Sequence, residues 1–361
     1  MAKIVVGMSG GVDSSTVAAL LKEQGHEVIG LFMRNWKETD EMGCCTADDD
    51  FQDVKDVCNK IGIPYYSIDF SEEYYDRVFT HFVEEYKKGR TPNPDVLCNK
   101  EIKFDAFLKY ALKTGCDYVA TGHYCRVEHR DGLSYLVRAE DDNKDQTYFL
   151  NQLTSEQLDK VIFPIGDIDK PTVRRLAQKY DLSTADKKDS TGICFIGERN
   201  FRQFLSQYIP MKEGDIVDTN GNIVGRHNGV FYYTIGQRKG LGIGGSKEGN
   251  GSRWFVLDKD IKKNILYVSQ GEIDVLYHNC LETDSFNFIP KKPDKNVFPC
   301  LVRIRHRQAL QKATCYIKED GGVKLVFDEK QRAIAEGQYA VIYDEKYCLG
   351  GGVIERKYNI E

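Results

Sequence analysis

The N-terminal segment places the strongest constraint on how this chain folds. Lys3–Met8 is an unbroken apolar, largely β-branched run, which is typical of a strand buried on both faces of a parallel sheet. Thr16–Gln24 is rich in helix formers and is followed by Gly25, a residue that favours a helix end. Between them lies Ser9–Ser15, which contains two adjacent glycines. The sequence therefore predicts a strand, a tight turn and a helix in direct succession.

The composition of the Ser9–Ser15 loop favours a phosphate ligand. Its two glycines let the backbone approach an anion, while the helix N-terminus and the serine hydroxyls supply donors. The loop is not a Walker A motif, and no GxGxxG follows the strand, which disfavours a dinucleotide site. The Asp13 carboxylate repels phosphate unless a cation lies between them, so ATP with Mg²⁺ fits better than a bare anion. The alternative is a Gly-Ser turn in which Asp13 caps the helix.

Strand and helix patterns alternate along the next part of the chain. The predicted elements are strands at Glu27–Met33, Tyr65–Phe70 and Asp117–Thr121, and helices around Phe51–Ile61, over Ser71–Gly89 and after Asn99. This alternation indicates an α/β fold with a doubly wound parallel sheet. Ligands bind such sheets at the carboxyl edge, where we expect the Ser9–Ser15 loop, Met33 and Gly122 to meet.

The second half of the chain has a different sequence pattern. At 361 residues the chain exceeds one ordinary core, which predicts two or three domains. Beyond about Tyr208 the pattern changes to strands and turns, and from Cys280 several short alternating strands predict a small β-barrel. The elements predicted before that barrel are a hairpin at Thr219–Asn222 and strands at Val230–Thr234 and Arg253–Leu257.

Composition and charge limit the class of protein. No segment approaches the ~18 apolar residues of a membrane span, and the N-terminus lacks a signal-peptide pattern, so we expect a cytoplasmic protein. A monomer is the default expectation. The net charge of −5 disfavours a broadly basic nucleic-acid binder, so such a partner needs a local basic patch. Arg303–Gln308 alternates charged residues with Ile304 and predicts a strand with one basic face, a candidate RNA-binding rim.

The cysteines argue against a structural role in disulfides or metal sites. There are 11 of them, an odd number without secretory context, and none is spaced Cys-x-x-Cys. Cys194 differs from most of the others because it lies in a glycine-bounded loop downstream of Lys187 and Lys188. Such an electropositive setting lowers the pKa of a thiol, and we expect Cys194 to be reactive.

Cys98 also has distinctive surroundings. It follows a segment with two prolines that carries Asn93 and Asp95, just before a predicted helix. The helix dipole and Lys100 favour the thiolate of Cys98 in that position. The alternative is an ordinary Asx-Pro connection with a buried cysteine.

Several stretches together carry a resemblance to known enzymes. Ser9-Gly10-Gly11-Val12-Asp13-Ser14 resembles the PP-loop of the ATP pyrophosphatases, which split ATP between its α- and β-phosphates and transfer AMP to a carbonyl oxygen. With the further stretches, the chain resembles the bacterial-type tRNA-specific 2-thiouridylases over nearly its whole length. The matching stretches are Gly7–Ser15, Asn93–Asp95 with Cys98-Asn99, Thr121–Tyr124, Lys144–Gln146, Asp189–Gly197, Tyr233–Gly240 and Ile304–Arg307.

The resemblance implies an architecture and a reaction. It implies a PP-loop domain over residues 1–200, a central β-rich domain over 201–277 and a tRNA-contacting β-barrel over 278–361. The implied reaction replaces the 2-oxygen of the wobble uridine in tRNAs for Lys, Glu and Gln with sulfur, giving 2-thiouridine, AMP and pyrophosphate. ATP and Mg²⁺ are the implied cofactors, with Mg²⁺ arriving on ATP near Asp13 rather than in a protein cage. A persulfide relay protein is the implied sulfur donor.

The resemblance also assigns residues. Cys98 is the implied nucleophile, Cys194 the persulfide carrier and Asp95 the acid or base, with a transient Cys98–Cys194 disulfide. The implied ATP contacts are Gly7, Met8, Ser9, Gly10, Gly11, Val12, Asp13, Ser14, Met33 and Gly122. The implied contacts to the target base are Asn93, Pro94 and Asp95, and those to the rest of the tRNA are His123, Lys144, Asp145, Gln146, Arg305, His306 and Gln338.

Two other functions share some of these features. An amide-forming ligase of the argininosuccinate or GMP synthetase kind uses the same loop, but it needs neither paired cysteines nor an RNA domain. A nucleotide-gated RNA-binding protein would bind tRNA and ATP and release no pyrophosphate. The two cysteines and the surroundings of Asp95 favour the sulfur-transfer enzyme over both.

Overall fold

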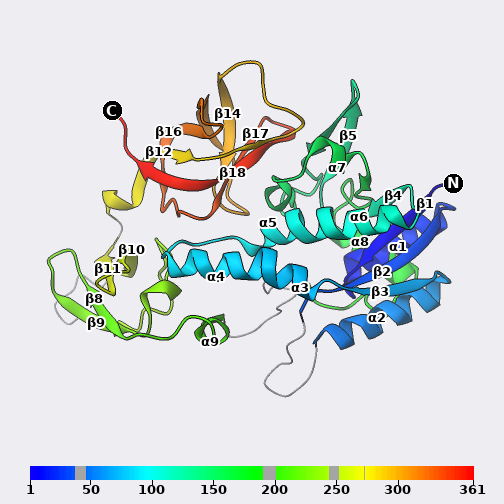
Figure 1. Cartoon of the computed structure of the whole chain (residues 1–361), viewed down its shortest axis with the longest axis horizontal. Coiled ribbons are helices and arrows are strands. Elements are labelled where there is room, and N and C mark those ends of the chain that lie inside the picture. The colour runs from blue at the N-terminus through cyan, green and yellow to red at the C-terminus, as the bar shows by residue number, and fades with distance from the viewer. Residues whose placement is uncertain (37–45, 190–200, 244–251, 272) are drawn as a thin grey trace.

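The computed structural model describes residues 1–36, 46–189, 201–243, 252–271 and 273–361 (Figure 1). Three sheets organise this part of the chain, with five, four and nine strands. The helices gather around the five-stranded sheet, while the other two sheets are built mostly from the C-terminal half of the chain (Figure 1). The Cys194 loop predicted to be reactive lies outside the described residues.

The five-stranded sheet is parallel throughout, which confirms the predicted fold class. Its strands, in spatial order, are β3 (Tyr65–Asp69), β2 (Glu27–Arg34), β1 (Lys3–Met8), β4 (Tyr118–Ala120) and β7 (Val161–Ile162). Ile4, Val5 and Val6 of the central strand are at most 2% exposed. Helices therefore cover both faces, as the unbroken apolar run predicted.

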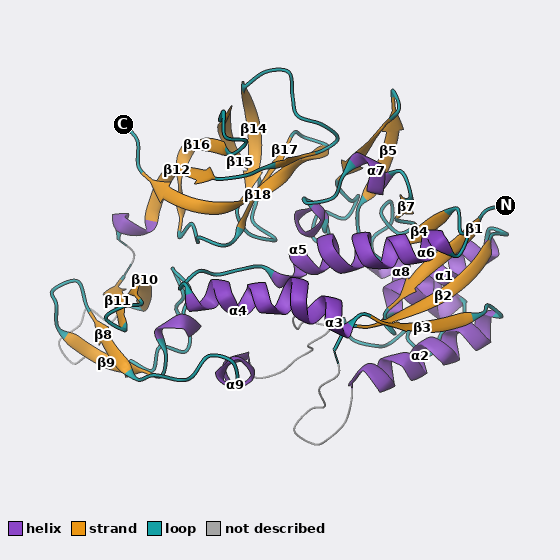
Figure 2. Ribbon diagram, viewed as in Figure 1, coloured by secondary structure: helices purple, strands orange, loops and turns teal. Residues whose placement is uncertain are grey.

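Different helices cover the two faces of this sheet. On one face α1 (Val12–Glu23), α2 (Thr46–Ile61) and α8 (Lys170–Lys179) pack against Ile4 and Val6. On the other face lie two long helical segments, 71–87 and 94–113, which run side by side (Figure 2). Their parts are α3 (Ser71–Tyr74), the π-helical η1 (Tyr75–Phe79) and α4 (Thr80–Lys87), then α5 (Pro94–Cys98), the π-helical η2 (Asn99–Phe107) and α6 (Leu108–Lys113).

The second long helix begins earlier than the sequence pattern predicted. We expected its start after Asn99, but α5 begins at Pro94. Asn93 is its N-cap, and the side-chain oxygen of Asn93 accepts a hydrogen bond from the Val96 N–H at 3.3 Å. Proline suits the first turn of a helix because the N–H it lacks has no partner there anyway. Cys98 therefore lies inside the helix and not ahead of it.

The four-stranded sheet forms the middle of the chain. Its strands, in spatial order, are β10 (Trp254–Asp260), β11 (Ile265–Gln270), β8 (Gly214–Val217) and β9 (Ile223–His227), and α9 (Phe201–Ser206) precedes them. The predicted hairpin turn at Thr219–Asn222 is confirmed between β8 and β9. The predicted strand at Val230–Thr234 is wrong, since Val230–Tyr232 is a short 3-10 helix, η4. Val230, Tyr232 and Tyr233 are all buried, so the alternation of a half-buried strand is absent.

The predicted C-terminal barrel is confirmed. Six antiparallel strands close on themselves through the pairing of β12 with β18. In order around the barrel they are β12 (Tyr277–Thr283), β16 (Val323–Arg332), β15 (Gln311–Ile317), β14 (Val297–Arg303), β17 (Tyr339–Tyr343) and β18 (Tyr347–Tyr358). The short η5 (Asp274–Leu276) leads into it, and β13 (Asn287–Phe288) pairs with β18. The sequence predicted one strand through Arg303–Gln308, but β14 ends at Arg303 and the chain turns there.

A hairpin from the first half of the chain extends the barrel sheet. Its strands are β5 (Arg126–Arg130) and β6 (Leu133–Val137), joined by the Asp131-Gly132 turn that the sequence predicted. β6 pairs with β18, where Val137 faces Tyr347. Two short helices follow the hairpin, η3 (Thr147–Leu150) and α7 (Ser155–Leu158). The half of the chain that carries the parallel sheet thus shares a second sheet with the barrel.

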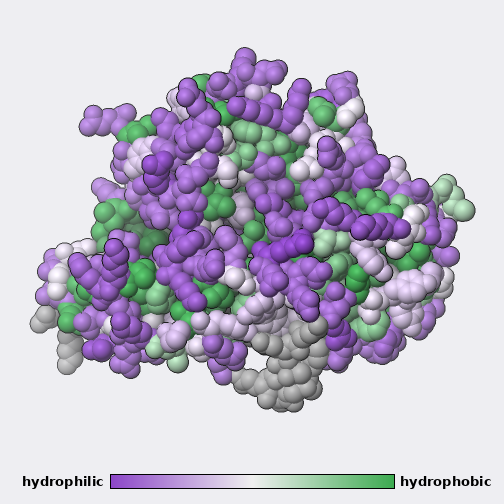
Figure 3. Space-filling view, viewed as in Figure 1, coloured by the Kyte–Doolittle hydropathy of each residue, from purple (hydrophilic) through white to green (hydrophobic). Residues whose placement is uncertain are grey.

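The surface matches a protein without a membrane span. Among the described residues, no helix is both long and apolar enough to cross a bilayer. The face in Figure 3 is mostly hydrophilic, with hydrophobic residues scattered among polar ones. The bulk of the apolar side chains instead fills three buried clusters in the described chain.

Candidate active site

The turn between β1 and α1 has the geometry of an anion-binding loop. Gly10 has φ +72°, and the helix begins at Val12 with Gly11 as its N-cap. Ser14 holds the loop closed, because its hydroxyl accepts a hydrogen bond from the Ser9 N–H at 3.1 Å and donates to the Gly11 carbonyl at 3.2 Å. Gly11 has no side chain to cap the helix, so the first N–H groups of α1 remain oriented towards a ligand.

The residues expected to contact ATP line up at the carboxyl edge of the parallel sheet. Those with accessible surface are Ser9, Gly11, Asp13 and Gly122, and those that are buried are Gly7, Met8, Gly10, Val12, Ser14 and Met33. A Cβ added to Gly122 would lie 3.0 Å from the Ser14 nitrogen, so only glycine lets the chain after β4 lie against the loop. The residues present therefore fit a nucleotide phosphate held at Ser9, Gly11 and the start of α1.

Asp13 is part of an ion-pair network and does not cap the helix. The Nζ of Lys170, the first residue of α8, lies 2.7 Å from Asp13 Oδ1 and 2.9 Å from Oδ2. The Tyr124 hydroxyl donates to the same Oδ1 at 2.8 Å. We expected a cation between Asp13 and a phosphate, and Lys170 supplies one from the protein itself.

The network continues to the residue that precedes the Cys194 segment. Lys170 Nζ also lies 2.7 Å from Asp189 Oδ1, and Asp189 additionally pairs with Lys144 at 2.8 Å and Arg174 at 3.2 Å. Burial alone would raise the pKa of Asp189, but the hydrogen bonds from Lys144 and Lys170 lower it to about 2. The carboxylate is therefore charged at any physiological pH, and it ties the start of the Cys194 segment to the PP-loop.

The Lys144–Gln146 triplet, expected at the tRNA, is engaged inside the protein. Lys144 pairs with Asp189, as described above. Asp145 is 1% exposed and pairs with Arg303 of β14 at 2.6 Å. Gln146 and Tyr124 exchange two hydrogen bonds of 2.9 Å each. Three adjacent residues thus hold Asp189, the barrel and the edge of the parallel sheet together.

The burial of Arg303 changes the predicted basic rim. Arg303 is 6% exposed and cannot contribute to an outward basic face. Arg305 and His306 are partly buried, and the Arg305 guanidinium donates to the Ala333 carbonyl at 2.6 Å. Burial, with Arg307 and Arg303 nearby, lowers the pKa of His306 to about 4. His306 is therefore neutral near pH 7, and its ring lies 4.4 Å from that of Phe149.

Cys98 lies one turn into α5, in the core. It is 0% exposed and is not disulfide-bonded. Asp95 lies in the first turn of the same helix, so the two side chains share one short element. Asn99, the next residue, donates its side-chain amide to the Phe149 carbonyl at 3.1 Å, which fixes this helix to η3. Cys194 and its predicted disulfide with Cys98 lie outside the described residues.

His123 follows β4 at the same edge of the sheet. Its Nδ1 lies 2.7 Å from the Thr121 hydroxyl, and its ring packs against Phe104 and Phe163. Burial, together with the charge of Lys103, lowers the pKa of His123 well below its usual value. His123 is therefore a neutral ring that offers a hydrogen-bonding edge and not a positive charge.

Comparison with known proteins decides the family. Three family descriptions match the chain in succession: a tRNA methyl transferase HUP domain over residues 2–198, a tRNA methyl transferase PRC-barrel domain over 202–270 and an aminomethyltransferase β-barrel domain over 278–354. The chain is 55% identical to the tRNA-specific 2-thiouridylase MnmA of Alkaliphilus oremlandii, covering 98% of this chain and 97% of the relative. It is 57% identical to the enzyme of the same name from Staphylococcus haemolyticus, covering 98% and 95%.

The chain belongs to the tRNA-specific 2-thiouridylase family. It is thus a sulfur-transferring enzyme of tRNA modification, as the resemblance of the sequence implied. The rival predictions of an amide-forming ligase and of an RNA-binding protein without chemistry find no support in these matches.

Two residues of this 2-thiouridylase site were missed in the sequence. Lys170 carries a signal that could have identified it, because a lysine in the first turn of a helix is opposed by the helix dipole. Such a residue needs an anionic partner, and Asp13 and Asp189 supply two. Tyr124 offers no comparable signal, since an aromatic residue after a strand is common in a core. Tyr124 reaches the Asp13 carboxylate only because the chain after β4 lies against α1 in the fold.

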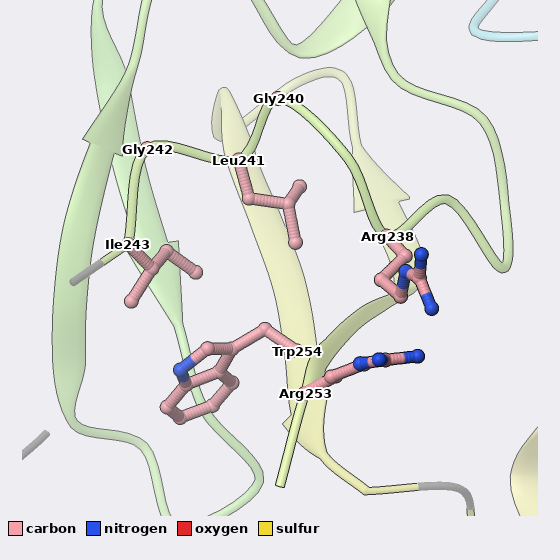
Figure 4. Close-up of a pocket in the computed structure, with 7 residues that line it drawn as sticks. All are labelled: Arg238, Gly240, Leu241, Gly242, Ile243, Arg253 and Trp254. Atoms are coloured by element: carbon pink, nitrogen blue, oxygen red, sulfur yellow. The ribbon is translucent and has the colours of Figure 1, made fainter. Parts of the chain in front are cut away.

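A second recess of the 2-thiouridylase lies in its middle part and has a volume of about 370 Å³. The exposed Arg238 and Arg253 lie side by side at one end, and Trp254 lies near Ile243 at the other (Figure 4). The recess thus has two guanidinium groups at one end and an aromatic ring at the other. The recess is lined by Arg238, Gly240, Leu241, Gly242, Ile243, Arg253 and Trp254.

In the described part of the chain, no group of three or more His, Cys, Asp or Glu side chains could hold a metal ion. The acidic groups nearest the PP-loop are instead paired with cations, as Asp13 is with Lys170. The Asp13 carboxylate is thus already neutralised by a cation of the protein.

Proposed function

We propose that this chain uses ATP to convert the wobble uridine of tRNAs for Lys, Glu and Gln to 2-thiouridine in the cytoplasm. The observation that carries this proposal is the Asp13–Lys170–Asp189 network, which joins the PP-loop to the chain five residues ahead of Cys194. Five extended residues span at most about 18 Å, so Cys194 stays within reach of the nucleotide loop. The near full-length similarity to 2-thiouridylases supports the same reaction.

In the first step, the 2-oxygen of the uridine attacks the α-phosphorus of ATP and pyrophosphate leaves. The start of α1, with Ser9 and Gly11, holds the developing charge of the pyrophosphate through backbone N–H groups. Lys170 neutralises Asp13, so the loop does not repel the phosphates. Mg²⁺ on the nucleotide supplies further charge stabilisation.

In the second step, the outer sulfur of a Cys194 persulfide attacks C2 of the uridine, and AMP leaves with the original oxygen. Cys98 then attacks the inner sulfur, which releases 2-thiouridine and leaves a Cys98–Cys194 disulfide. In the alternative order, Cys98 attacks the persulfide first and the released sulfide attacks C2. Both orders end in the same disulfide, which an external thiol must reduce. Asp95, in the first turn of α5, serves as acid or base.

We propose that the tRNA approaches where the catalytic half meets the barrel. Asn93, Pro94 and Asp95 face the target base, which can be splayed out of the anticodon loop without opening a duplex. The partly buried His123, Lys144, Arg305 and His306 lie around this junction, and a relay protein supplies the persulfide sulfur. With His306 neutral, we expect stacking from its ring and positive charge from Arg305.

The test is mass spectrometry of nucleosides from unmodified tRNA(Lys) incubated with the protein as a monomer, ATP, Mg²⁺ and a persulfide donor. We expect 2-thiouridine that depends on ATP, with AMP and pyrophosphate as co-products. Pyrophosphate release without sulfur incorporation, rescued by a nitrogen donor, would reject thiolation in favour of an amide-forming ligase. Binding of tRNA and ATP without pyrophosphate would reject catalysis altogether.

A further inference from the structure

Gln338, at the barrel end that faces the catalytic half, reaches the segment that carries Asn93. Its side-chain nitrogen donates to the Thr91 carbonyl at 2.7 Å and to the Pro92 carbonyl at 3.4 Å. Its side-chain oxygen accepts from the Tyr148 hydroxyl at 3.4 Å. The whole carboxamide of Gln338 is therefore engaged within the protein, on the two residues that precede Asn93.

Backbone contacts reinforce this attachment. The Thr91 N–H donates to the Glu336 carbonyl at 2.9 Å. Gly337 has φ +89°, and a Cβ there would lie 3.0 Å from the Thr91 nitrogen, so the two chains are in van der Waals contact. Arg90 adds a two-pronged ion pair to Glu355 of β18, with both N–O distances 2.7 Å. The residues from Arg90 to Pro92 are thus held by the barrel.

The attached segment has little means of ordering itself. Pro92 and Pro94 have no N–H, so the backbone around Asn93 makes few hydrogen bonds of its own. Carbonyls that are removed from water need donors, and Gln338 supplies the donor for two of them. Asn93 then caps α5, whose first turn holds Asp95 and whose end holds Cys98.

We infer that Gln338 is a positioning residue: it orders the Asn93–Cys98 segment from the barrel side, through the Thr91 and Pro92 carbonyls. This inference rests on the proposed function for its catalytic consequence, since it assigns the Asn93–Cys98 segment to the target base. The ordering itself is a property of the free protein. The contacts that dock the barrel against the catalytic half are then the same contacts that order the Asn93–Cys98 segment.

The test compares Gln338→Met, which keeps the shape and removes the donor, with Gln338→Glu and with Gln311→Met as a matched control. Gln311 lies on β15 and also donates its amide to a backbone carbonyl, that of Ala309 at 3.0 Å. In tRNA-free protein, we expect amide hydrogen exchange in residues 93–98 to accelerate roughly five- to tenfold in Gln338→Met, the loss of about one hydrogen bond. Gln311→Met should leave that exchange unchanged.

A second set of measurements separates positioning from tRNA contact. At saturating tRNA, we expect Gln338→Met to lower the single-turnover thiolation rate about tenfold, a loss that does not depend on the Kd for tRNA. In Gln338→Glu, faster exchange should revert as the pH falls below about 5, because the protonated carboxyl can donate again. Unchanged exchange together with a tenfold weaker Kd would overturn the inference in favour of direct tRNA contact. If the protein makes no 2-thiouridine, the exchange measurement still decides the positioning role.

Discussion

The ammonium of Lys170 lies 2.7 Å from the carboxylate of Asp13 and, at its other side, 2.7 Å from that of Asp189. One buried cation thus neutralises the negative charge of the PP-loop and anchors the residue from which the Cys194 segment departs. The loop that carries Asp13 and the residue Asp189, which precedes the Cys194 segment in the chain, share a counterion.

Replacing Lys170 with methionine should weaken both stability and adenylation. The change leaves Asp13 and Asp189 facing one another without their common cation, and because Asp13 is partly exposed we expect a loss of about 1–3 kcal/mol in unfolding free energy. Pyrophosphate release in the presence of tRNA should fall at least tenfold. The matched control is Lys179→Met on the same helix, whose exposed pair with Glu23 should leave the unfolding free energy nearly unchanged. Equal effects in urea titrations of both variants would contradict the shared-counterion role.

The two glycines Gly10 and Gly132 provide a matched pair of tests. Their φ values are +72° and +73°, so alanine meets the same backbone strain at both, about 1 kcal/mol. A Cβ at Gly10 would lie 2.6 Å from the Asp50 carbonyl oxygen, while nothing lies within 4 Å at Gly132. We expect Gly10→Ala to lose ATP-dependent pyrophosphate release, measured by a coupled assay, and Gly132→Ala to retain it. If both variants retain pyrophosphate release, the loop tolerates the displacement that a Cβ at Gly10 causes.

The buried pair between Asp145 and Arg303 should be costly to break. Their side chains are 0% and 7% exposed, and they join the catalytic half to the barrel. Arg303→Met leaves a buried carboxylate without its partner, for which we expect a loss of about 3–5 kcal/mol in unfolding free energy. The double variant Asp145→Leu with Arg303→Met should recover part of that loss in the same denaturant titration. A loss below about 1 kcal/mol in the single variant would place the pair in a solvated setting.

The two proposed sulfur-handling cysteines should affect different steps. Cys194→Ser removes the persulfide carrier, so 2-thiouridine should fall below detection while pyrophosphate release continues. Cys98→Ser should instead leave sulfur on Cys194. If Cys98 normally attacks first, the Cys194 peptide gains the mass of one sulfur atom, and if the persulfide attacks uridine first, Cys194 stays disulfide-linked to the tRNA. Cys280→Ala in the barrel is the control and should thiolate normally. Full thiolation by Cys194→Ser would remove the persulfide role.

His306 should make the stability of the protein depend on pH. The pKa of His306 is about 4 in the folded protein, below its usual value of 6.5. The unfolded chain therefore binds more protons between these values, and stability falls as the pH is lowered through this range. We expect His306 to contribute roughly 1–2 kcal/mol of destabilisation between pH 7 and pH 5. His306→Phe keeps an aromatic ring beside Phe149 and should abolish this part of the loss in unfolding free energy. Urea titrations at pH 7 and pH 5 measure the difference.

Much of the parallel sheet could be predicted because its signals are local. The unbroken run at Lys3–Met8 and the helix formers after it define β1 and α1 without any reference to the rest of the chain. The hairpin at Asp131-Gly132 was likewise predictable from two residues. The start of α5 was not, because a proline after Asn93 serves equally as a turn residue and as a first-turn helix residue.

Other features depend on contacts between side chains that are distant in the chain, and the local sequence does not indicate these contacts. Arg303 alternates with Ile304 as an outward charge would, but a carboxylate from Asp145, distant in the chain, stabilises it inside. Lys144, Gln146 and Gln338, which are predicted to contact tRNA, also have partners within the protein that the sequence did not indicate. The residues next to a charged side chain on a strand or turn do not indicate whether its partner is a phosphate or another residue.

The pairing of β6 with β18 bears on how the chain acquires its structure during synthesis. Glu128 of the hairpin accepts a hydrogen bond from Tyr347, 219 residues further along. Until the last strand leaves the ribosome, β6 presents an unpaired edge, and a chain cut before residue 347 keeps that edge permanently. Contacts of such long sequence separation form slowly, so β6 gains its second neighbour only after the C-terminal strand has been made. The order of translation thus makes the joining of the two halves a late event.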